Sequence, residues 1–286
     1  MGNASSGGVL VTGASTGIGS DCVRFLHEKG IRVLAGVRRS EDGEALRAAI
    51  SEQITPVLLD VTDPHSIESA RKEVLTAVGA KGLRGLVNNA GIFAVDPLEI
   101  ADLEESRAIF EVNVIGLIAV TQSFLPLIRE AGGRIVNIGS VQGYASLPYS
   151  GVYSASKFAI EGITDALRRE LRPWGIPVSV IEPGAIQSLI QSKAVTNVEG
   201  KIERLSAPQR ELYGEGLQII QKGLEIEQNI AIPGEEVARA VHHALTAERP
   251  RLRYRVGSDA KKLYRQFRTL PDRMLDRIVN RLLGLG

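Results

Sequence analysis

Tyr153 and Lys157 stand four residues apart, in a stretch whose apolar residues recur at a helical period, so both side chains leave the same face of a helix. A free phenol has a pKa of about 10, and an ammonium group one turn away favours the phenolate and lowers that value. A tyrosine tuned in this way can exchange a proton with an alcohol or carbonyl oxygen. Ser140 ends a strand-like run just upstream, where its hydroxyl could hydrogen-bond the same oxygen. The three residues predict acid–base chemistry, although a Tyr–Lys pair alone also occurs on many surface helices.

A glycine-rich turn near the N-terminus offers a second place for chemistry. Residues 9–12 resemble a short buried strand, Gly13, Gly17 and Gly19 follow directly, and a helical pattern then runs to about Gly30. Strand, glycine turn and helix in this order predict phosphate binding, because glycines let the backbone approach a pyrophosphate and the helix N-terminus offers free N–H groups. The alternative for such a motif is a tight strand–helix turn without a ligand.

The end of the second predicted strand, residues 32–37, indicates which dinucleotide this turn would bind. An NAD site usually places a carboxylate there for the ribose hydroxyls, whereas an NADP site omits it and supplies arginine. Here Val37 is followed by Arg38 and Arg39, and the next acid is Glu41. The pattern favours NADP(H), with Arg38 the better candidate for the 2′-phosphate because a guanidinium matches phosphate in a bidentate way. Two arginines that open a loop can also be merely solvated charges.

Strands and helices alternate along the chain, which predicts a parallel sheet covered on both faces. We therefore expect an α/β fold with one doubly wound (Rossmann) domain over residues 1–257. Inside this domain, residues 185–233 lose the strong pattern and break into short amphipathic pieces, as a lid or substrate-binding segment would. Further elements are expected as strands at 56–59, 83–87, 134–139, 176–181 and 252–256, and as helices at 41–50, 63–78, 103–128 and 235–247.

Residues 258–286 are expected to form a helical extension beyond the domain. Apolar residues recur there at helical spacing, and Pro271 should split the segment into two short helices. The interspersed lysines and arginines are compatible with an anionic membrane surface. The favoured alternative is that the apolar stripe packs over the substrate side of the domain or against a second subunit, because such stripes usually face a protein core.

Composition limits the classes of function. The chain has 286 residues, a formal net charge of +1 and 44% hydrophobic residues. This balance is ordinary for a globular protein and does not indicate a nucleic-acid partner. No run approaches the ~18 apolar residues of a membrane span, and residues 1–8 lack the features of a signal peptide. Cys22, the single cysteine, lies in an apolar helical pattern as a small core residue. No metal-ligand spacing occurs, and a cytoplasmic location is the default expectation.

Taken together, these motifs resemble the short-chain dehydrogenase/reductase family over residues 9–256. A single matching motif would be weak evidence, whereas several motifs in the same order as in the family support the resemblance. The residues that match are the cofactor loop Thr12-Gly13-x-x-x-Gly17-x-Gly19, the motif Asn88-Asn89-Ala90-Gly91, the helix asparagine Asn113, the catalytic group Ser140 with Tyr153-x-x-x-Lys157, and Pro183-Gly184.

The resemblance implies a role for each matching residue. Tyr153 would be the acid/base and Ser140 would position the substrate oxygen. Lys157 would bind the nicotinamide ribose and lower the tyrosine pKa, and Asn113 would hold a water that links the lysine to solvent. Taken alone, Asn113 could equally bond local backbone. The expected cofactor contacts are Gly13, Ser15, Thr16, Gly17, Ile18, Gly19, Arg38, Arg39, Asp60, Val61, Asn89, Ala90, Gly91, Tyr153, Lys157, Pro183, Gly184, Ile186 and Ser188.

Two residues depart from the family pattern. Ser188 stands where the family commonly has threonine, and it keeps a hydroxyl. Thr16 stands where many NADP-dependent members carry a basic residue, which leaves use of NAD(H) open beside the favoured NADP(H).

Finer features, among them residues 58–64 and the C-terminal extension, look most like the retinol, steroid and hydroxybutyrate dehydrogenase-like group. This resemblance implies a lipophilic alcohol or carbonyl substrate, hydride transfer to or from NADP(H), and a homodimer or homotetramer. Two alternatives stay open: an NAD-preferring alcohol dehydrogenase of the same fold, and a non-catalytic regulatory protein that senses NADP(H).

Overall fold

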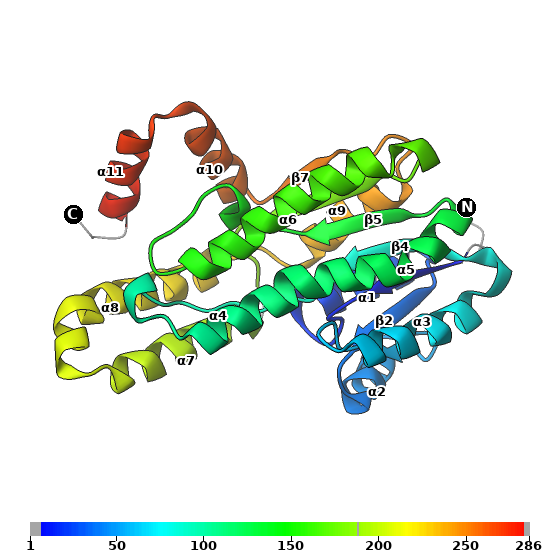
Figure 1. Cartoon of the computed structure of the whole chain (residues 1–286), viewed down its shortest axis with the longest axis horizontal. Coiled ribbons are helices and arrows are strands. Elements are labelled where there is room, and N and C mark those ends of the chain that lie inside the picture. Colours follow the sequence, from blue (N-terminus) through cyan, green and yellow to red (C-terminus); the bar gives the residue numbers. More distant parts are fainter. Residues whose placement is uncertain (1–6, 188, 283–286) are drawn as a thin grey trace.

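A seven-stranded sheet forms the middle of the molecule (Figure 1). The computed structural model describes residues 7–187 and 189–282. All neighbouring strands are parallel, in the order β3-β2-β1-β4-β5-β6-β7, which confirms the doubly wound α/β fold. The strands are β1 (Gly8–Val11), β2 (Val33–Val37), β3 (Thr55–Leu58), β4 (Leu83–Asn88), β5 (Arg134–Ile138), β6 (Val178–Pro183) and β7 (Arg253–Val256).

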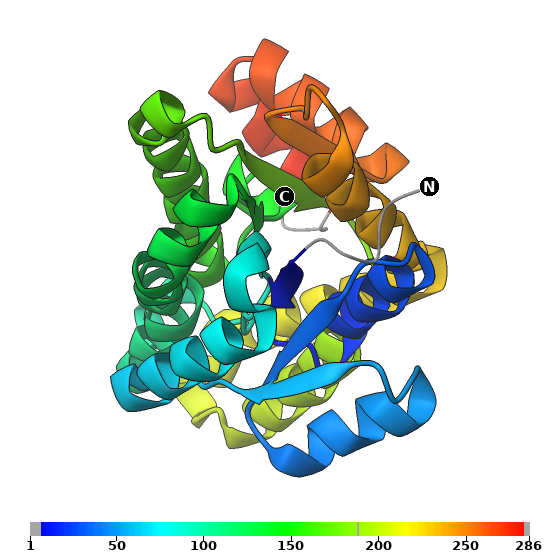
Figure 2. The ribbon, with the colours of Figure 1, turned by 90° about the vertical axis from the view of Figure 1, so that its right-hand side faces the viewer.

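Helices cover both faces of the sheet, as Figure 2 shows. Parallel strands need crossover connections, and here the helices supply them. One face carries α1 (Gly17–Glu28), α2 (Ser40–Ala49) and α9 (Glu235–Thr246). The other carries α3 (Pro64–Val78), α5 (Leu117–Ala131) and α6 (Gly151–Glu170), with α4 (Leu103–Phe110) leading into α5 through the π-helical turn η3 (Glu111–Gly116).

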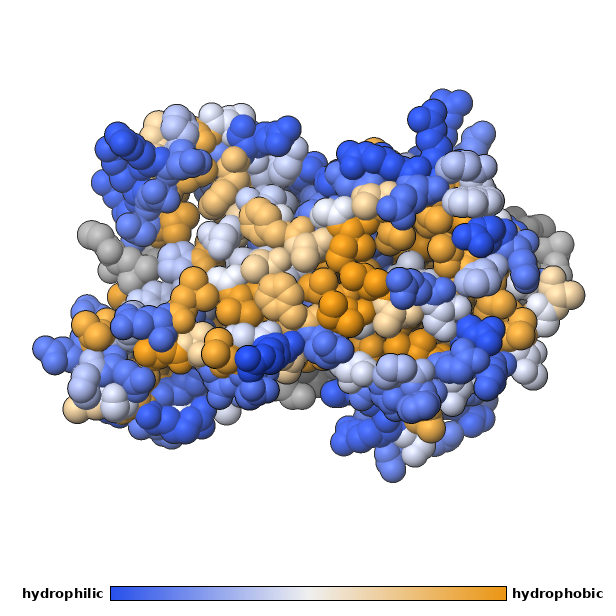
Figure 3. Space-filling view, in the orientation of Figure 1, coloured by the Kyte–Doolittle hydropathy of each residue, from blue (hydrophilic) through white to orange (hydrophobic). Residues whose placement is uncertain are grey.

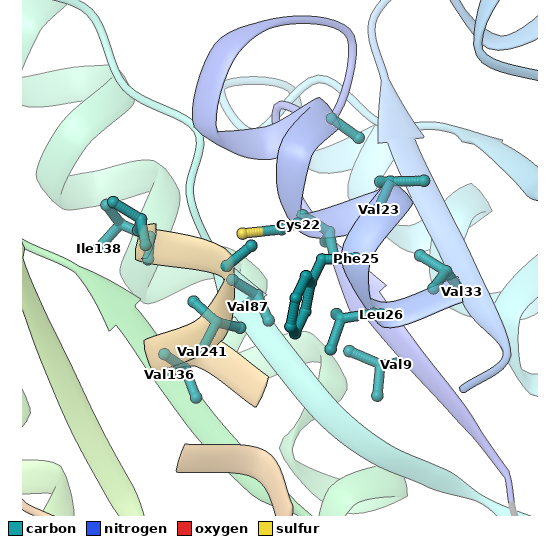
Figure 4. Packing of buried hydrophobic residues seen from close by; sticks show 14 of the residues in the cluster. Val9, Cys22, Val23, Phe25, Leu26, Val33, Val87, Val136, Ile138 and Val241 are labelled. Atoms are coloured by element: carbon teal, nitrogen blue, oxygen red, sulfur yellow. The ribbon is translucent and has the colours of Figure 1, made fainter. Parts of the chain in front are cut away.

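Two apolar cores fill the spaces between the sheet and these helices. On the α1 and α9 side, Cys22, Phe25 and Val241 belong to one cluster with Val9 and Val136 of the sheet (Figure 4). The sequence-based expectation that Cys22 is a core residue is confirmed, because its side chain is fully buried. On the other side, residues of α3 and α5 pack over β1, β2 and β4.

Local sequence explains where α3 begins and where the long helix around Asn113 changes its winding. The Asp63 carboxylate accepts a hydrogen bond from the His65 N–H at 2.9 Å, and Pro64 occupies the first turn, where its missing N–H costs nothing. The predicted helix 103–128 changes to π-helical winding around Asn113, in η3. Single π-turns of this kind are frequent at functional sites.

The segment 185–233 is more regular than the sequence indicated. In place of short pieces it contains two long helices, α7 (Leu189–Arg204) and α8 (Ala207–Ile230), and Ser206 between them forms a capping box with Gln209. The apolar pattern is weak because one narrow side is buried, at Val198, Leu217 and Ile220, while Leu212 and Ile226 point to solvent.

A buried cation holds α7 on the loop that follows β4. The Lys201 Nζ donates to the Val95 carbonyl at 3.1 Å and to the carboxylates of Asp96 and Glu105, the latter at 2.8 Å. The Lys201 side chain is only 15% exposed, so this ion pair is largely shielded from solvent. Lys201 thus fastens α7 to the loop after β4 and to α4, while the expected lid role of residues 185–233 stays a prediction.

The C-terminal segment forms the two predicted helices, α10 (Ser258–Thr269) and α11 (Asp272–Leu282), divided at Pro271. Helix α10 packs on β7 and on the short turn η4 (Val141–Gly143) beside Ser140. The Tyr144 hydroxyl donates to the Ala260 carbonyl at 2.8 Å. Helix α10 therefore lies next to the loop that carries Ser140, while the expectation that the tail covers the substrate side stays a prediction.

The continuous helix Leu103–Ala131 is the one described helix that is long and apolar enough to cross a membrane. The sequence predicts no such segment by its uninterrupted apolar runs, which are too short, but the mean hydropathy of this helix reaches 1.7 because its polar residues are few and scattered. In the structure 44% of that window is buried inside the protein, where α5 packs on β4 and α3. Its outer side is apolar as well, and Figure 3 shows apolar side chains gathered over α5 and α6.

Removal of residues 258–286 should lower the midpoint of thermal unfolding or weaken substrate binding, because it deletes the contacts of α10 with β7 and with Tyr144. Calorimetry and substrate titration of a chain that ends at Gly257 test this. A chain that ends at Thr269 is the control, since it keeps α10 and should lose less. Salt-sensitive co-sedimentation with anionic vesicles that only the full chain shows would instead support a membrane role for the tail.

Candidate active site

The predicted site residues lie at one edge of the sheet, where β1, β4, β5 and β6 end. Doubly wound folds bind ligands at the carboxyl ends of their strands, close to the point where the strand order reverses. In this sheet β1 and β4 are neighbours, with β2 and β3 to one side and β5, β6 and β7 to the other. The loops after these strands bring together residues that are far apart in sequence.

The glycine turn after β1 fits a dinucleotide pyrophosphate. Gly13 and Gly17 have φ of +61° and +54°, a conformation that side chains disfavour. A Cβ on Gly19 would stand 2.2 Å from the Gly13 carbonyl oxygen, so only glycine allows the helix to start this close. Thr16 precedes α1 without a side-chain cap, and the first turn has no acid, which leaves its N–H groups open to an anion.

Asn89, which directly follows β4, holds the glycine turn in place through hydrogen bonds. Its Nδ2 donates to the carbonyls of Thr12 and Gly13 at 2.9 and 3.0 Å. In return, the Thr12 Oγ1 accepts from the N–H groups of Asn89 and Ala90, both at 3.0 Å. The sequence assigned Asn89 to the cofactor ribose, and the structure adds this loop-holding role. Ala90 is the residue that a Cβ on Gly13 would strike, at 2.8 Å from its Cα.

The two arginines after β2 differ in their partners. Arg39 forms a bidentate pair with Asp42, at 3.0 Å from Nε and 2.8 Å from an Nη. Arg38 is exposed and has no hydrogen bond or ion pair among residues 7–187 and 189–282. The guanidinium of Arg38 is therefore available to a ligand, whereas that of Arg39 is engaged.

Asp60 and Val61 close the adenine side of the expected cofactor site. The Asp60 carboxylate accepts from the N–H and the hydroxyl of Thr62, at 2.9 and 2.7 Å. Burial acts to raise the pKa of Asp60, but these bonds and the charge of Arg38 outweigh it and hold the pKa below its ordinary value. Val61 is buried against Gly116, where a Cβ would stand 2.8 Å from the valine Cγ2.

Tyr153 and Lys157 project from the same face of α6, as their spacing predicted. The Lys157 Nζ lies 5.6 Å from the centre of the Tyr153 ring and donates to the Ile138 carbonyl at 3.0 Å. Lys157 is only 6% exposed, and burial lowers its pKa to about 8, while the charge of Glu161 acts to raise it. The ammonium is thus largely protonated at neutral pH.

The pKa of Tyr153 runs opposite to the sequence-based expectation. Burial raises the pKa of Tyr153 to about 12, and the hydrogen bond with Ser140 lowers it only in part. The expected effect of Lys157 does not appear, because its Nζ is directed to the Ile138 carbonyl and burial dominates the phenol. Tyr153 consequently keeps its proton at neutral pH and is ready to donate it.

Asn113 bonds backbone that is 21 residues away and also reaches helix α6, while its expected role in holding a water beside Lys157 stays a prediction. Its Oδ1 accepts from the Ile92 N–H at 2.8 Å, and its Nδ2 donates to the Ile92 carbonyl at 2.9 Å. The same Nδ2 donates to the Ser156 Oγ at 3.0 Å, next to Lys157 on α6. The π-turn therefore ties the loop after β4 to the catalytic helix, and a Cβ on Gly91 would stand 3.3 Å from the Asn113 Oδ1.

The loop after β6 carries the last group of expected contacts. Pro183 ends β6, the Gly184 N–H donates to the Val256 carbonyl at 2.9 Å, and Ile186 is buried beside Ile232. Ser188 lies outside the described residues. Ser15 and Ile18 belong to the glycine turn already placed beside the end of β4.

Phe93 and Glu161 also lie at the site, and neither was predicted from the sequence. The Phe93 ring lies edge-on to the Tyr153 ring, with centroids 4.7 Å apart. Glu161, one turn beyond Lys157, pairs with Arg253 of β7 at 3.1 Å, and its other oxygen is buried without a partner. Only the helical spacing of Glu161 from Lys157 could have drawn attention to it. Within the described part of the chain, no group of His, Cys, Asp and Glu could hold a metal ion.

Comparisons with known proteins agree with this geometry. The family model for short chain dehydrogenases matches residues 8–199. Retinol dehydrogenase 16 of Mus musculus is 39% identical over 279 residues, covering 95% of this chain and 87% of the relative. The 17-beta-hydroxysteroid dehydrogenase type 6 of Rattus norvegicus is 38% identical over 277 residues, covering 94% and 86%.

A short chain dehydrogenase from Burkholderia cenocepacia J2315, solved in complex with NADP, has a TM-score of 0.73 and 25% identity, covering 96% of this chain and 98% of that one. The chain belongs to the short-chain dehydrogenase/reductase family. Its relatives place it in the part of the family that holds retinol and steroid dehydrogenases.

Replacement of Tyr153 by phenylalanine should abolish most turnover while the fold and cofactor binding persist. The change removes one hydroxyl and leaves the ring against Phe93. Loss of a general acid–base group typically lowers the rate by ~10² to 10⁴. Steady-state kinetics and a cofactor titration of the purified variant test this, and turnover close to that of the unmodified protein would contradict the role of Tyr153.

Proposed function

We propose that this protein is an NADP(H)-dependent oxidoreductase that interconverts a lipophilic ketone or aldehyde and the corresponding alcohol, of retinoid, steroid or hydroxyacyl type. The observation that carries the proposal is the placement of Ser140, Tyr153 and Lys157 together at the sheet edge onto which the glycine turn also opens.

The chemistry divides between the cofactor and the side chains. Nicotinamide, when bound, supplies or accepts the hydride. Tyr153 donates its proton to the carbonyl oxygen in the reducing direction, and the Ser140 hydroxyl hydrogen-bonds the charge that develops there. Lys157 places a positive charge 5.6 Å from the centre of the Tyr153 ring, and it would also bind the nicotinamide ribose of a bound cofactor. Burial raises the pKa of Tyr153 to about 12, so the phenol is protonated at neutral pH and can act as the acid in the reducing direction, and oxidation runs the same path backwards.

The preference for NADP(H) rests on charge at the end of β2. A 2′-phosphate needs a cation there, and Arg38 is exposed and unengaged among the described residues, while Arg39 is held by Asp42. No carboxylate follows Val37 to bind free ribose hydroxyls, which is what an NAD site would use.

A lipophilic substrate is supported by the apolar surroundings of Tyr153. The Phe93 ring contacts the Tyr153 ring, and Phe93 also packs against the apolar cluster of Val95, Leu217 and Ile220. Apolar side chains next to the reacting hydroxyl favour apolar substrates, because they offer them surface to bury and few polar partners. The names of the relatives, retinol and 17-beta-hydroxysteroid dehydrogenases, point to the same class.

The proposed assembly is a homodimer or homotetramer in the cytoplasm. The face formed by α4, η3 and α6 exposes Phe110, Ile115 and Phe158 to 39%, 48% and 46%. Exposed apolar patches of this kind mark interaction surfaces, and a second copy of this chain would cover the patch seen over α5 and α6 in Figure 3.

A substrate screen tests the proposal. The purified protein is incubated with NADPH or NADH and a panel of retinoid, steroid and short hydrophilic carbonyls, and the corresponding alcohols are tested with the oxidised cofactors. Turnover of lipophilic carbonyls with NADPH supports it. Faster turnover with NADH favours the NAD-preferring alternative. Binding of NADP(H) without turnover of any compound favours the sensor.

Replacement of Arg38 by leucine should raise the KM for NADPH and change the KM for NADH much less, because only the phosphorylated cofactor loses a charge-assisted partner. Arg39→Leu is the matched control. It removes the same charge from the same loop but breaks only the pair with Asp42, and it should change cofactor choice little. Equal effects of both variants on NADPH would contradict a specific role of Arg38 at the phosphate.

A further inference from the structure

The backbone after β6 is held by an unusual partner from the C-terminal tail. The Ala185 N–H donates to the Asp259 Oδ2 at 2.8 Å, across a sequence separation of 74 residues. On the same stretch, the Gln187 N–H donates to the Ile232 carbonyl at 3.0 Å, and the Ile232 N–H donates to the Ala185 carbonyl at 3.1 Å. Asp259 and Ile232 thus fix the backbone on either side of Ile186.

The backbone N–H of Ile186 takes no part in these hydrogen bonds. Consecutive N–H groups of an extended chain point to opposite sides, so the Ile186 N–H faces away from the partners of Ala185 and Gln187. Among the hydrogen bonds of the described residues, the Ile186 N–H has no protein acceptor. A buried backbone N–H is rarely left unsatisfied, which indicates that a ligand atom completes it.

Two glycines make room for the Asp259 carboxylate. A Cβ on Gly184 would stand 2.0 Å from the Asp259 Oδ2, and one on Gly257 would stand 2.2 Å from the Oδ1. Gly257 also has φ of +107°, which turns the chain from β7 into α10. The glycine of the Pro183-Gly184 motif is therefore required here by the tail, and not only by the loop itself.

The start of α10 is anchored firmly enough to hold Asp259 in place. Ala260 is fully buried, and its carbonyl accepts from the Tyr144 hydroxyl at 2.8 Å. The Tyr264 ring packs edge-on against Tyr144, with centroids 5.4 Å apart, and Arg255 stacks on its face at 3.3 Å. The same helix thus contacts the loop after β5, which carries Ser140, and the loop after β6.

From these contacts the geometry points to Asp259 as a positioning residue for the nicotinamide end of the cofactor: by engaging the Ala185 N–H, its carboxylate sets the Ile186 N–H to donate to the carboxamide. This assignment rests on the proposed function. Asp259 touches neither cofactor nor substrate, and it acts through the backbone of residues 184–186. The tail is therefore part of cofactor recognition and not only a cover over the substrate side.

The test compares two ligands that differ only at the nicotinamide end. Binding of NADP+ and of 2′-phospho-ADP-ribose, which lacks nicotinamide, is measured by calorimetry for the full chain and its variants. Asp259→Ala should weaken NADP+ roughly tenfold, as loss of a charge-assisted hydrogen bond does, and leave 2′-phospho-ADP-ribose unchanged. Asp259→Asn should restore most of the affinity, because an amide oxygen can accept from the Ala185 N–H. Asp272→Ala, an exposed acid at the start of α11, is the control.

Each outcome either supports or overturns the assignment of Asp259 as a positioning residue. Retained 2′-phospho-ADP-ribose binding shows that a variant is folded, and a selective loss of NADP+ affinity in Asp259→Ala supports the assignment. Equal NADP+ affinity in Asp259→Ala and the unmodified protein overturns it while leaving the proposed function intact. Equal weakening of both ligands, or an Asn variant as weak as the Ala variant, also overturns it. If the unmodified protein binds neither ligand, the proposed function falls as well.

Discussion

The burial of the Lys157 ammonium is the constraint on which the site depends. A buried charge is stable only when polar groups surround it, and the Ile138 carbonyl at 3.0 Å is its direct partner, with the carboxylate of Glu161 one turn further along α6. Because Ile138 ends β5 and Lys157 lies in the middle of α6, this contact fixes the helix against the edge of the sheet. Tyr153, one turn earlier, is placed over that edge as a consequence, within reach of Ser140.

The same principle holds the other loops of the site. Three loops of the site are each held by a side chain that bonds backbone from a different element: Asn89 on the glycine turn, Asn113 on Ile92, and Asp259 on Ala185. Backbone groups held in this way present the remaining N–H groups in fixed directions, which lowers the entropy lost when a ligand binds. The scaffold thus fixes the loops of the site before a cofactor enters, and Lys201 in addition fastens α7 to α4.

Features written in local sequence could be predicted, and those that depend on distant contacts could not. The alternation of strands and helices, the glycine turn and the break at Pro271 each follow from neighbouring residues. Lys201 and Asp259 look like ordinary surface charges in sequence, because their partners lie 105 and 74 residues away. The length of helices α7 and α8 was not predicted, because only a narrow side of each helix is buried and the apolar pattern is therefore weak. The prediction that the pKa of Tyr153 is lowered was wrong, because the sequence spacing shows the neighbouring Lys157 but not how deeply the phenol is buried.

The central claim is that these side chains carry out hydride transfer to a lipophilic carbonyl with Tyr153 as proton donor. The most direct measurement follows the hydride itself: NADPH carrying deuterium at the transferable position of nicotinamide is incubated with the protein and a retinoid or steroid carbonyl, and the product alcohol is analysed by mass spectrometry. The account predicts an alcohol with deuterium on the carbinol carbon, formed by the unmodified protein and nearly absent with Tyr153→Phe. An unlabelled alcohol, or no alcohol from any carbonyl although NADPH binds, would contradict it.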